Sequence, residues 1–186
     1  MPSMILIDVE LPEPVVFSES VTGLISSLHV VLLGWYEVPE QTLPEQAREQ
    51  FEGEAGEALE QIAQQFRDAG ADVTTRLVFT GNAFETINRI SMEESCDAVY
   101  VARPATELKR VLVPLRGTPN LASITRFVRD MVQEYTTDVT LMHVLSEGET
   151  EPTMRKILFG SIPEQIAIEA SVPVIVVRHA AEDVPA

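Results

Sequence analysis

The sequence predicts an α/β fold, with an open parallel sheet flanked by helices and a partial second repeat of the strand–helix–strand unit. Two observations carry this prediction. Short apolar runs alternate with amphipathic helical patterns, as they do where crossover helices join parallel strands. The pattern also restarts near the middle of the chain, because Val111–Val113 repeats Ile5–Ile7 and Asp138–Val144 repeats His29–Trp35.

The sequence pattern of the first half of the chain predicts four strands and three helices. An amphipathic stretch from about Pro14 to Leu28 predicts the first helix. Thr42–Glu45 is a capping box that opens a long second helix, and Gly70 ends that helix. Asn82 and Glu85 form an N-cap pair for the third helix. The four strands are Met4–Val9, His29–Tyr36, Asp72–Thr80 and Asp97–Ala102.

The second half is abbreviated. After Val111–Val113, Thr118 caps a helix whose first position is Pro119. Ser146–Thr153 is polar and predicts a linker. Gly160–Glu164 combines a glycine turn with a capping box and opens the last helix. The aliphatic run Val172–Val177 predicts the final strand.

Acidic residues dominate the charge. The chain has 29 acidic and 13 basic residues, a formal net charge of −16, and only two lysines, Lys109 and Lys156. Many carboxylates with almost no lysine favour adaptation to high salt, where screening removes self-repulsion; an ordinary acidic cytosolic protein is the alternative. This charge argues against binding to nucleic acid or to anionic membranes.

Other classes are excluded by missing motifs. Cys96 is the only cysteine, which rules out an internal disulfide, and its position before an apolar strand predicts burial. We expect no signal peptide and no membrane insertion, because the apolar runs are strand-sized. The chain is therefore expected to be cytoplasmic. It shows no catalytic triad, carboxylate pair or metal motif, so we expect neither an enzyme nor a metal protein.

Several segments resemble the universal stress protein family. Ile157–Gln165 followed by Ala170–Arg178 is similar to the end of that family's unit, where Gly-Ser opens the last helix and a Pro-Val-aliphatic run forms the last strand. Gly81–Ala83 and Cys96–Val101 are similar to its third helix and fourth strand, and Lys109–Pro114 to its opening strand. The resemblance implies a Rossmann-like sheet with strand order 3-2-1-4-5.

The order of these segments leaves two architectures open. Residues 105–150 could be an insertion, after which the last helix and strand complete the first sheet. Alternatively, residues 1–104 form one four-strand unit, residues 105–180 form a shortened second unit with three strands, and residues 181–186 form a tail. We prefer the shortened tandem. Its three parallel strands alone would leave apolar edges exposed, so we expect association with the first half or with another chain to stabilise it.

The family's ATP-binding signature is largely missing. By resemblance, nucleotide-binding members carry G-x2-G-x9-G-[ST] after the fourth strand, where backbone N–H groups approach phosphates. Only Gly160 and Ser161 remain, and a helix N-cap with Glu164 explains this pair equally well. The chain after the fourth strand, Ala102–Thr106, contains neither of the other glycines.

The acidic residue that the family places after its first strand is also changed. Arg116 occupies that place in the second copy, and Glu10 occupies it in the first. Arginine cannot accept a hydrogen bond from an adenine amino group or a ribose hydroxyl. Arg116 and Thr118 could hold another anion, although a salt-bridged arginine is the simpler interpretation. We therefore predict no cofactor, with ATP or AMP at a vestigial site as the alternative.

These features predict a non-enzymatic, stress-related regulatory protein that acts through oligomerisation or partner binding. We expect a homodimer through Val172–Val177, because an apolar edge strand invites another strand and the family commonly dimerises through its fifth strand. An adenine-nucleotide sensor with a modified pocket is one alternative. A cytosolic regulator of a membrane transporter is another, suggested by the resemblance of Arg116–Pro119 to a turn in transporter-linked stress domains.

Overall fold

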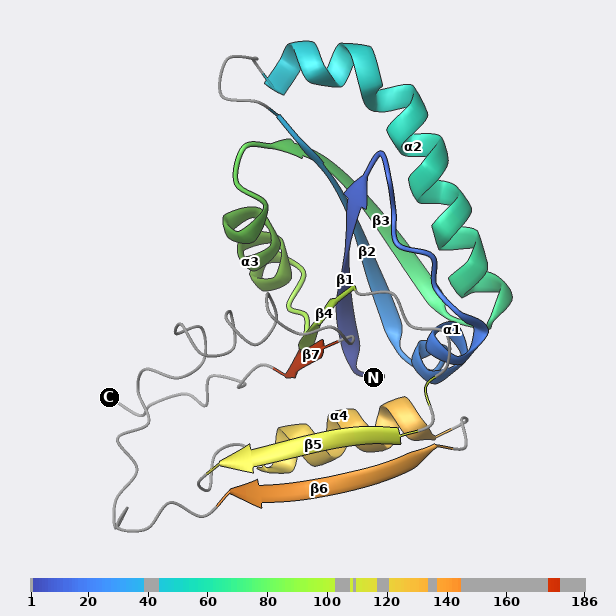
Figure 1. Cartoon of the computed structure of the whole chain (residues 1–186), viewed down its shortest axis with the longest axis vertical. Helices are drawn as coiled ribbons and strands as arrows, with labels where there is room; N and C mark the ends of the chain where they lie inside the picture. The colour runs from blue at the N-terminus through green and yellow to red at the C-terminus, as the bar shows by residue number, and fades with distance from the viewer. Residues whose placement is uncertain are drawn as a thin grey trace.

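The computed structural model describes residues 2–38, 44–102, 108, 110–116, 121–133, 137–144 and 174–177. These residues form two sheets (Figure 1). The first has five strands, in the order β3-β2-β1-β4-β7: β1 (Met4–Leu11), β2 (His29–Glu37), β3 (Asp72–Thr80), β4 (Ala98–Val101) and β7 (Val174–Val177). The second has two: β5 (Arg110–Arg116) and β6 (Asp138–Val144). The helices are α1 (Glu19–Ile25), α2 (Pro44–Asp68), α3 (Ala83–Glu93) and α4 (Leu121–Val132).

The α/β, Rossmann-like fold class is confirmed. β1 pairs in parallel with both β2 and β4, and β2 pairs in parallel with β3. The sheet is mostly parallel, and its last strand departs from the predicted parallel arrangement: β7 runs antiparallel to β4, with Ala98 opposite Val177 and Val101 opposite Val174. A strand that comes from a distant part of the chain needs no crossover helix behind it and can enter a sheet in either direction.

β5, α4 and β6 form a second strand–helix–strand unit with parallel strands. The preferred arrangement assigned a third strand to this unit, but β7 belongs to the first sheet. β4 offers an apolar edge to β7, and this pairing satisfies the backbone groups on the sides of the two strands that face each other. This is the placement expected if residues 105–150 are an insertion. The domain boundaries 1–104, 105–180 and 181–186 stay a prediction.

The local helix signals are partly confirmed. Asn82 caps α3, and its side chain accepts a hydrogen bond from the backbone N–H of Glu85 at 3.2 Å. Gly70 follows α2 at φ +103°, in the left-handed region that glycine adopts most readily. α1 begins only at Glu19, later than the predicted Pro14, and Ser18 before it has the extended backbone of an N-cap residue. The caps predicted at Thr42, Thr118 and 160–164 lie outside the described residues.

The first sheet is covered on both faces. One face packs against α1, α2 and α4, in a core that contains Ile5, Ile7, Leu24, Phe66 and Phe127. The other face packs against α3, where Leu6, Val31, Leu33, Ile90 and Cys96 meet. The predicted burial of Cys96 is confirmed, since the residue is 3% exposed. No helix in the described part of the chain is long and apolar enough to cross a membrane.

Three polar contacts hold α4 against the first sheet, at the end where β1, β2 and β4 begin. Ser3 Oγ donates to Asp130 Oδ2 at 2.8 Å, and Ser27 Oγ donates to the backbone carbonyl of Asp130 at 2.6 Å. Arg126 Nη2 lies 2.6 Å from Asp97 Oδ1. Burial by itself would raise the pKa of Asp130, but the Ser3 and Arg129 hydrogen bonds and the charges of Arg129 and Arg126 outweigh it and lower that pKa.

Replacing Asp130 with asparagine should therefore destabilise the protein in a pH-dependent way. A carboxyl whose pKa is lowered by folding adds stability above its unfolded pKa of about 3.9, and this stability is lost as the pH falls through the folded value. We expect Asp130→Asn to lower the free energy of unfolding by about 1 kcal/mol at neutral pH. The difference from the unmodified protein should shrink in acid.

Urea unfolding at a series of pH values measures this effect. The control is Asp138→Asn, because Asp138 is exposed at the start of β6. A gap between the Asp130→Asn variant and the unmodified protein that stays constant from neutral to acid pH would show that the ionised carboxylate does not hold α4.

Candidate functional site

The candidate site lies where the strand order of the first sheet reverses. From β1 the chain adds β2 and β3 on one side, and β4 then pairs with the other side of β1. In open α/β sheets, ligands bind at this reversal, outside the carboxyl ends of the strands. Here those ends belong to β1 and β4. The residues to examine are therefore the last ones of β1 and β4, together with the neighbouring end of β2.

Asp8 links β1 to the chain that leaves β4. Its Oδ1 atom accepts a hydrogen bond from the backbone N–H of Ala102 at 3.2 Å. The side chain is half-buried, within a strand whose neighbouring residues Ile7 and Val9 are buried. A carboxylate accepts hydrogen bonds and donates none, so a ligand that contacted Asp8 would have to present N–H or O–H groups.

Tyr100 lies on the opposite face of the same strand pair. It is 1% exposed, and its ring is 6.2 Å from the ring of Phe17 between centroids. Its hydroxyl is buried and has no hydrogen-bond partner in the described part of the molecule. Burial, and secondly the nearby charge of Asp8, raise the pKa of Tyr100 far above its usual value. The phenol therefore stays neutral and can act only as an uncharged donor or acceptor.

The carboxyl ends of β1 and β2, beside the point where the strand order reverses, carry acidic and aromatic side chains. Glu10 is exposed near the end of β1 and lies in register with Trp35 of β2, which is half-buried. Trp35 Nε1 is a second buried donor that lacks a hydrogen-bond partner among the described residues. Glu37 ends β2 and is exposed. Two carboxylates at these strand ends would repel a phosphate rather than attract one.

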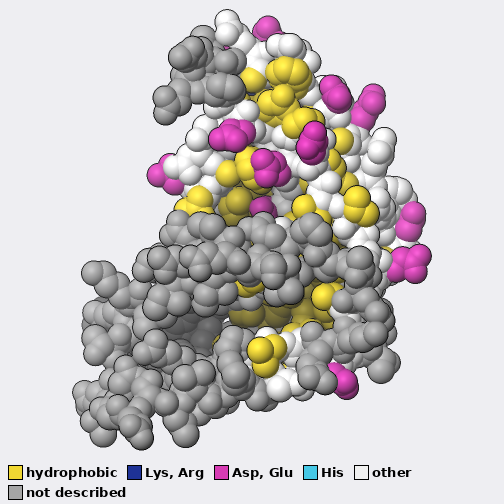
Figure 2. All heavy atoms as spheres, viewed as in Figure 1, with side chains coloured by type: hydrophobic (Ala, Val, Ile, Leu, Met, Phe, Trp, Pro, Cys, Tyr) yellow, Lys and Arg dark blue, Asp and Glu magenta, His cyan; other side chains and the backbone are white. Residues whose placement is uncertain are grey.

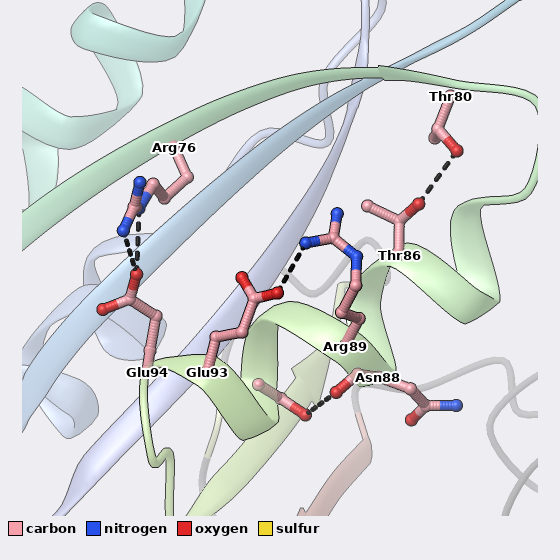
Figure 3. Close-up of polar contacts among 8 residues, drawn as sticks. Arg76, Thr80, Thr86, Asn88, Arg89, Glu93 and Glu94 are labelled. Atoms are coloured by element: carbon pink, nitrogen blue, oxygen red, sulfur yellow. Dashed lines mark hydrogen bonds and ion pairs between the residues drawn. The ribbon is translucent and has the colours of Figure 1, made fainter.

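Arginines do not offset this repulsion. Six arginine side chains are described, and each makes an ion pair with a carboxylate: Arg48 with Glu52, Arg67 with Glu60, Arg76 with Glu94, Arg89 with Glu93, Arg126 with Asp97 and Arg129 with Asp130. Figure 3 shows two of these pairs beside α3. In Figure 2 the described surface carries scattered carboxylates between apolar patches, with no basic side chain in view.

The sequence-predicted site residues are not gathered at one place. Glu10 lies at the carboxyl end of β1, as predicted for the first copy. Arg116 ends β5, in the second sheet, where its backbone pairs with Val144. Thr118, Gly160 and Ser161 lie outside the described residues, so their role as a vestigial anion site stays a prediction.

Sequence reasoning missed Asp8 and Tyr100. Each is the one polar residue in an otherwise apolar stretch of a central strand: Asp8 follows Ile5–Ile7, and Tyr100 stands between Val99 and Val101. Burying a polar group in such a strand without a hydrogen-bond partner costs free energy. A polar residue in an otherwise apolar strand was therefore the sequence signal that could have identified Asp8 and Tyr100. Among the described residues, no three metal-ligating side chains lie close enough together to hold an ion.

Replacing Tyr100 with phenylalanine tests whether its hydroxyl has a partner. Removing a buried hydroxyl that makes no hydrogen bond should leave stability unchanged or raise it, by up to about 2 kcal/mol. The matched control is Thr86→Val, because Thr86 Oγ1 lies 2.8 Å from Thr80 Oγ1 (Figure 3). Removing that paired hydroxyl should cost about 1 kcal/mol. Urea unfolding of both variants measures the contrast, and a Tyr100→Phe variant as destabilised as the control would reveal an undetected partner.

Comparison with known proteins gives a distant structural likeness. No family model matches the chain, and no curated protein matches it. A universal stress protein from Archaeoglobus fulgidus is 14% identical, with a TM-score of 0.36 over 75% of this chain and 92% of its own. A structure of the A. fulgidus universal stress protein in complex with dAMP gives 14% and 0.37, over 76% and 98%. A family member from Burkholderia pseudomallei gives 13% and 0.38, over 75% and 95%. At these values the likeness establishes neither family membership nor a ligand.

Proposed function

We propose that this chain is a cytoplasmic, non-enzymatic regulatory protein of the stress-response type, which acts by association with a second copy of itself. The observation that carries the proposal is the complete pairing of the described arginines with carboxylates. A nucleotide site needs cationic side chains or free backbone N–H groups for its phosphates. The described strand ends supply carboxylates instead.

The two edges of the first sheet indicate which surface associates. β3 forms one edge and carries charged and hydroxyl side chains, among them Asp72, Thr74 and Arg76. The charged side chains Asp72 and Arg76 disfavour pairing with another strand. β7 forms the other edge and consists only of Val174, Ile175, Val176 and Val177, all half-buried. Among the described residues β7 pairs only with β4, and an apolar strand at the edge of a sheet is suited to β-strand addition.

Absence of nucleotide binding is the first expected result. A ligand present at 100 times its dissociation constant stabilises a protein by about 2.7 kcal/mol, which for a chain of this size raises Tm by several degrees. We expect ATP, AMP and cyclic AMP each to shift Tm by less than about 1 °C. Thermal denaturation with each nucleotide measures this, with inorganic phosphate as the control for a general anion effect. A shift of several degrees with a nucleotide but not with phosphate would support the sensor alternative.

A single lysine in β7 should abolish self-association. Ile175 and Val177 pack against the core, so Val176 alternates to the opposite face of the strand, and a lysine there would disfavour edge-to-edge pairing. Light scattering after size exclusion in high salt should give twice the chain mass for the unmodified protein and the single chain mass for Val176→Lys. Val16→Lys is the matched control, because Val16 is 81% exposed and lies outside β7. An unmodified protein that elutes as a monomer would contradict the dimer.

A further inference from the structure

β7 is a short strand that needs support beyond its own pairing. It has four residues, and its antiparallel register with β4 runs from Ala98 opposite Val177 to Val101 opposite Val174. A strand of this length at a sheet edge buries little apolar surface through backbone pairing alone. Side chains on the faces of the sheet must therefore supply much of the free energy that holds β7.

α4 supplies that contact from the second unit. It lies against β7 (Figure 1). Its side chains Phe127 and Met131 are each 1% exposed. Ile175 and Val177 pack against the same core cluster as these two residues. α4 and β7 are far apart in the sequence, so short loops do not hold them together. Their contact therefore depends on how firmly α4 is docked on the first sheet.

The polar contacts of α4 act at the same place. Asp97, the partner of Arg126, directly precedes Ala98, which pairs with Val177. Asp97 also accepts the backbone N–H of Met4 at 2.9 Å, which ties the amino ends of β1 and β4 together. At the carboxyl end of α4, Ser27 donates to the carbonyl oxygens of Asp130 and Met131. Carbonyls at a helix carboxyl terminus lack partners within the helix, so Ser27 caps α4 from outside the second unit.

Charge favours the docked state. Residues 1–102 hold eighteen acidic and four basic residues, whereas residues 108–144 hold five basic and three acidic residues. The unit of β5, α4 and β6 therefore carries a small positive net charge, and it packs against a first unit whose net charge is strongly negative. Arg126 is half exposed, and a pair of this kind contributes only modestly by itself. The apolar side chains and the Ser27 cap must act with it.

We propose that α4 is a latch that holds β7 in the first sheet, so that docking of the second unit determines whether the edge strand is available to a second chain. The consequence for self-association rests on the proposed function, whereas the latch itself does not. When α4 is docked, β7 presents an ordered edge. When α4 is released, Ile175 and Val177 lose part of their cover, and β7 separates from β4.

Hydrogen exchange of backbone amides tests the latch directly. The variants are Arg126→Ala, Ser27→Ala and their combination, each of which leaves the apolar core intact. Arg126→Ala should speed exchange of the β7 amides by about 2- to 5-fold, and the double variant by about 10-fold. Arg89→Ala is the matched control, because Arg89 is exposed to a similar extent as Arg126 but lies on α3 and pairs with Glu93 of the same helix. It should change β7 exchange by less than about 2-fold.

Two outcomes would overturn the latch. If the double variant speeds exchange in α4 but leaves β7 protected, then β7 does not depend on α4. If it changes neither element, these contacts do not hold α4. Size exclusion with light scattering separates this proposal from the proposed function. A dimeric unmodified protein should lose dimer in the double variant, whereas a monomeric one would refute self-association while the exchange result still decides the latch.

Discussion

The burial of β1 on both faces is the constraint on which the rest of the structure depends. Ile5, Leu6 and Ile7 are fully buried, and successive residues of a strand point to opposite faces, so both faces of the sheet must be covered. Each such side chain contributes about 1.5–3 kcal/mol when it is removed from water. α3 covers one face, and α1 with α2 covers part of the other.

The short α1 leaves this second face incompletely covered. α1 has only seven residues, and the residues before it follow Pro12 and Pro14 without forming a helix. Phe127 and Met131 of α4 enter the same core as the α1 residues Leu24 and Ile25. The second unit is thus part of the hydrophobic core of the first sheet. This explains why a chain with two sheets places a helix of one against the edge of the other.

The sequence predicted the elements that depend on local patterns. The four strands of the first half, the N-cap at Asn82 and the end of α2 before Gly70 all follow from side-chain alternation and from the backbone preferences of single residues. The direction of β7 could not be predicted in this way, because Val174–Val177 is aliphatic throughout and its sequence carries no signal of strand direction. The roles of Asp8 and Tyr100 depend on the pairing of β1 with β4, which brings together residues that are distant along the chain.

Electrostatics supports the apolar edge as the point at which we propose self-association. Two copies that each carry a formal charge of −16 repel one another over distances comparable to the Debye length, about 10 Å at 0.1 M salt and 3 Å at 1 M. Backbone pairing between edge strands requires an approach of about 5 Å, which is shorter than the first value and longer than the second. At high salt the repulsion is therefore screened at the distance where the strands meet. β7 contributes no carboxylate to that contact, whereas β3 at the other edge contributes Asp72. The charge that would hinder association at the β3 edge thus favours β7 as the site of the proposed association.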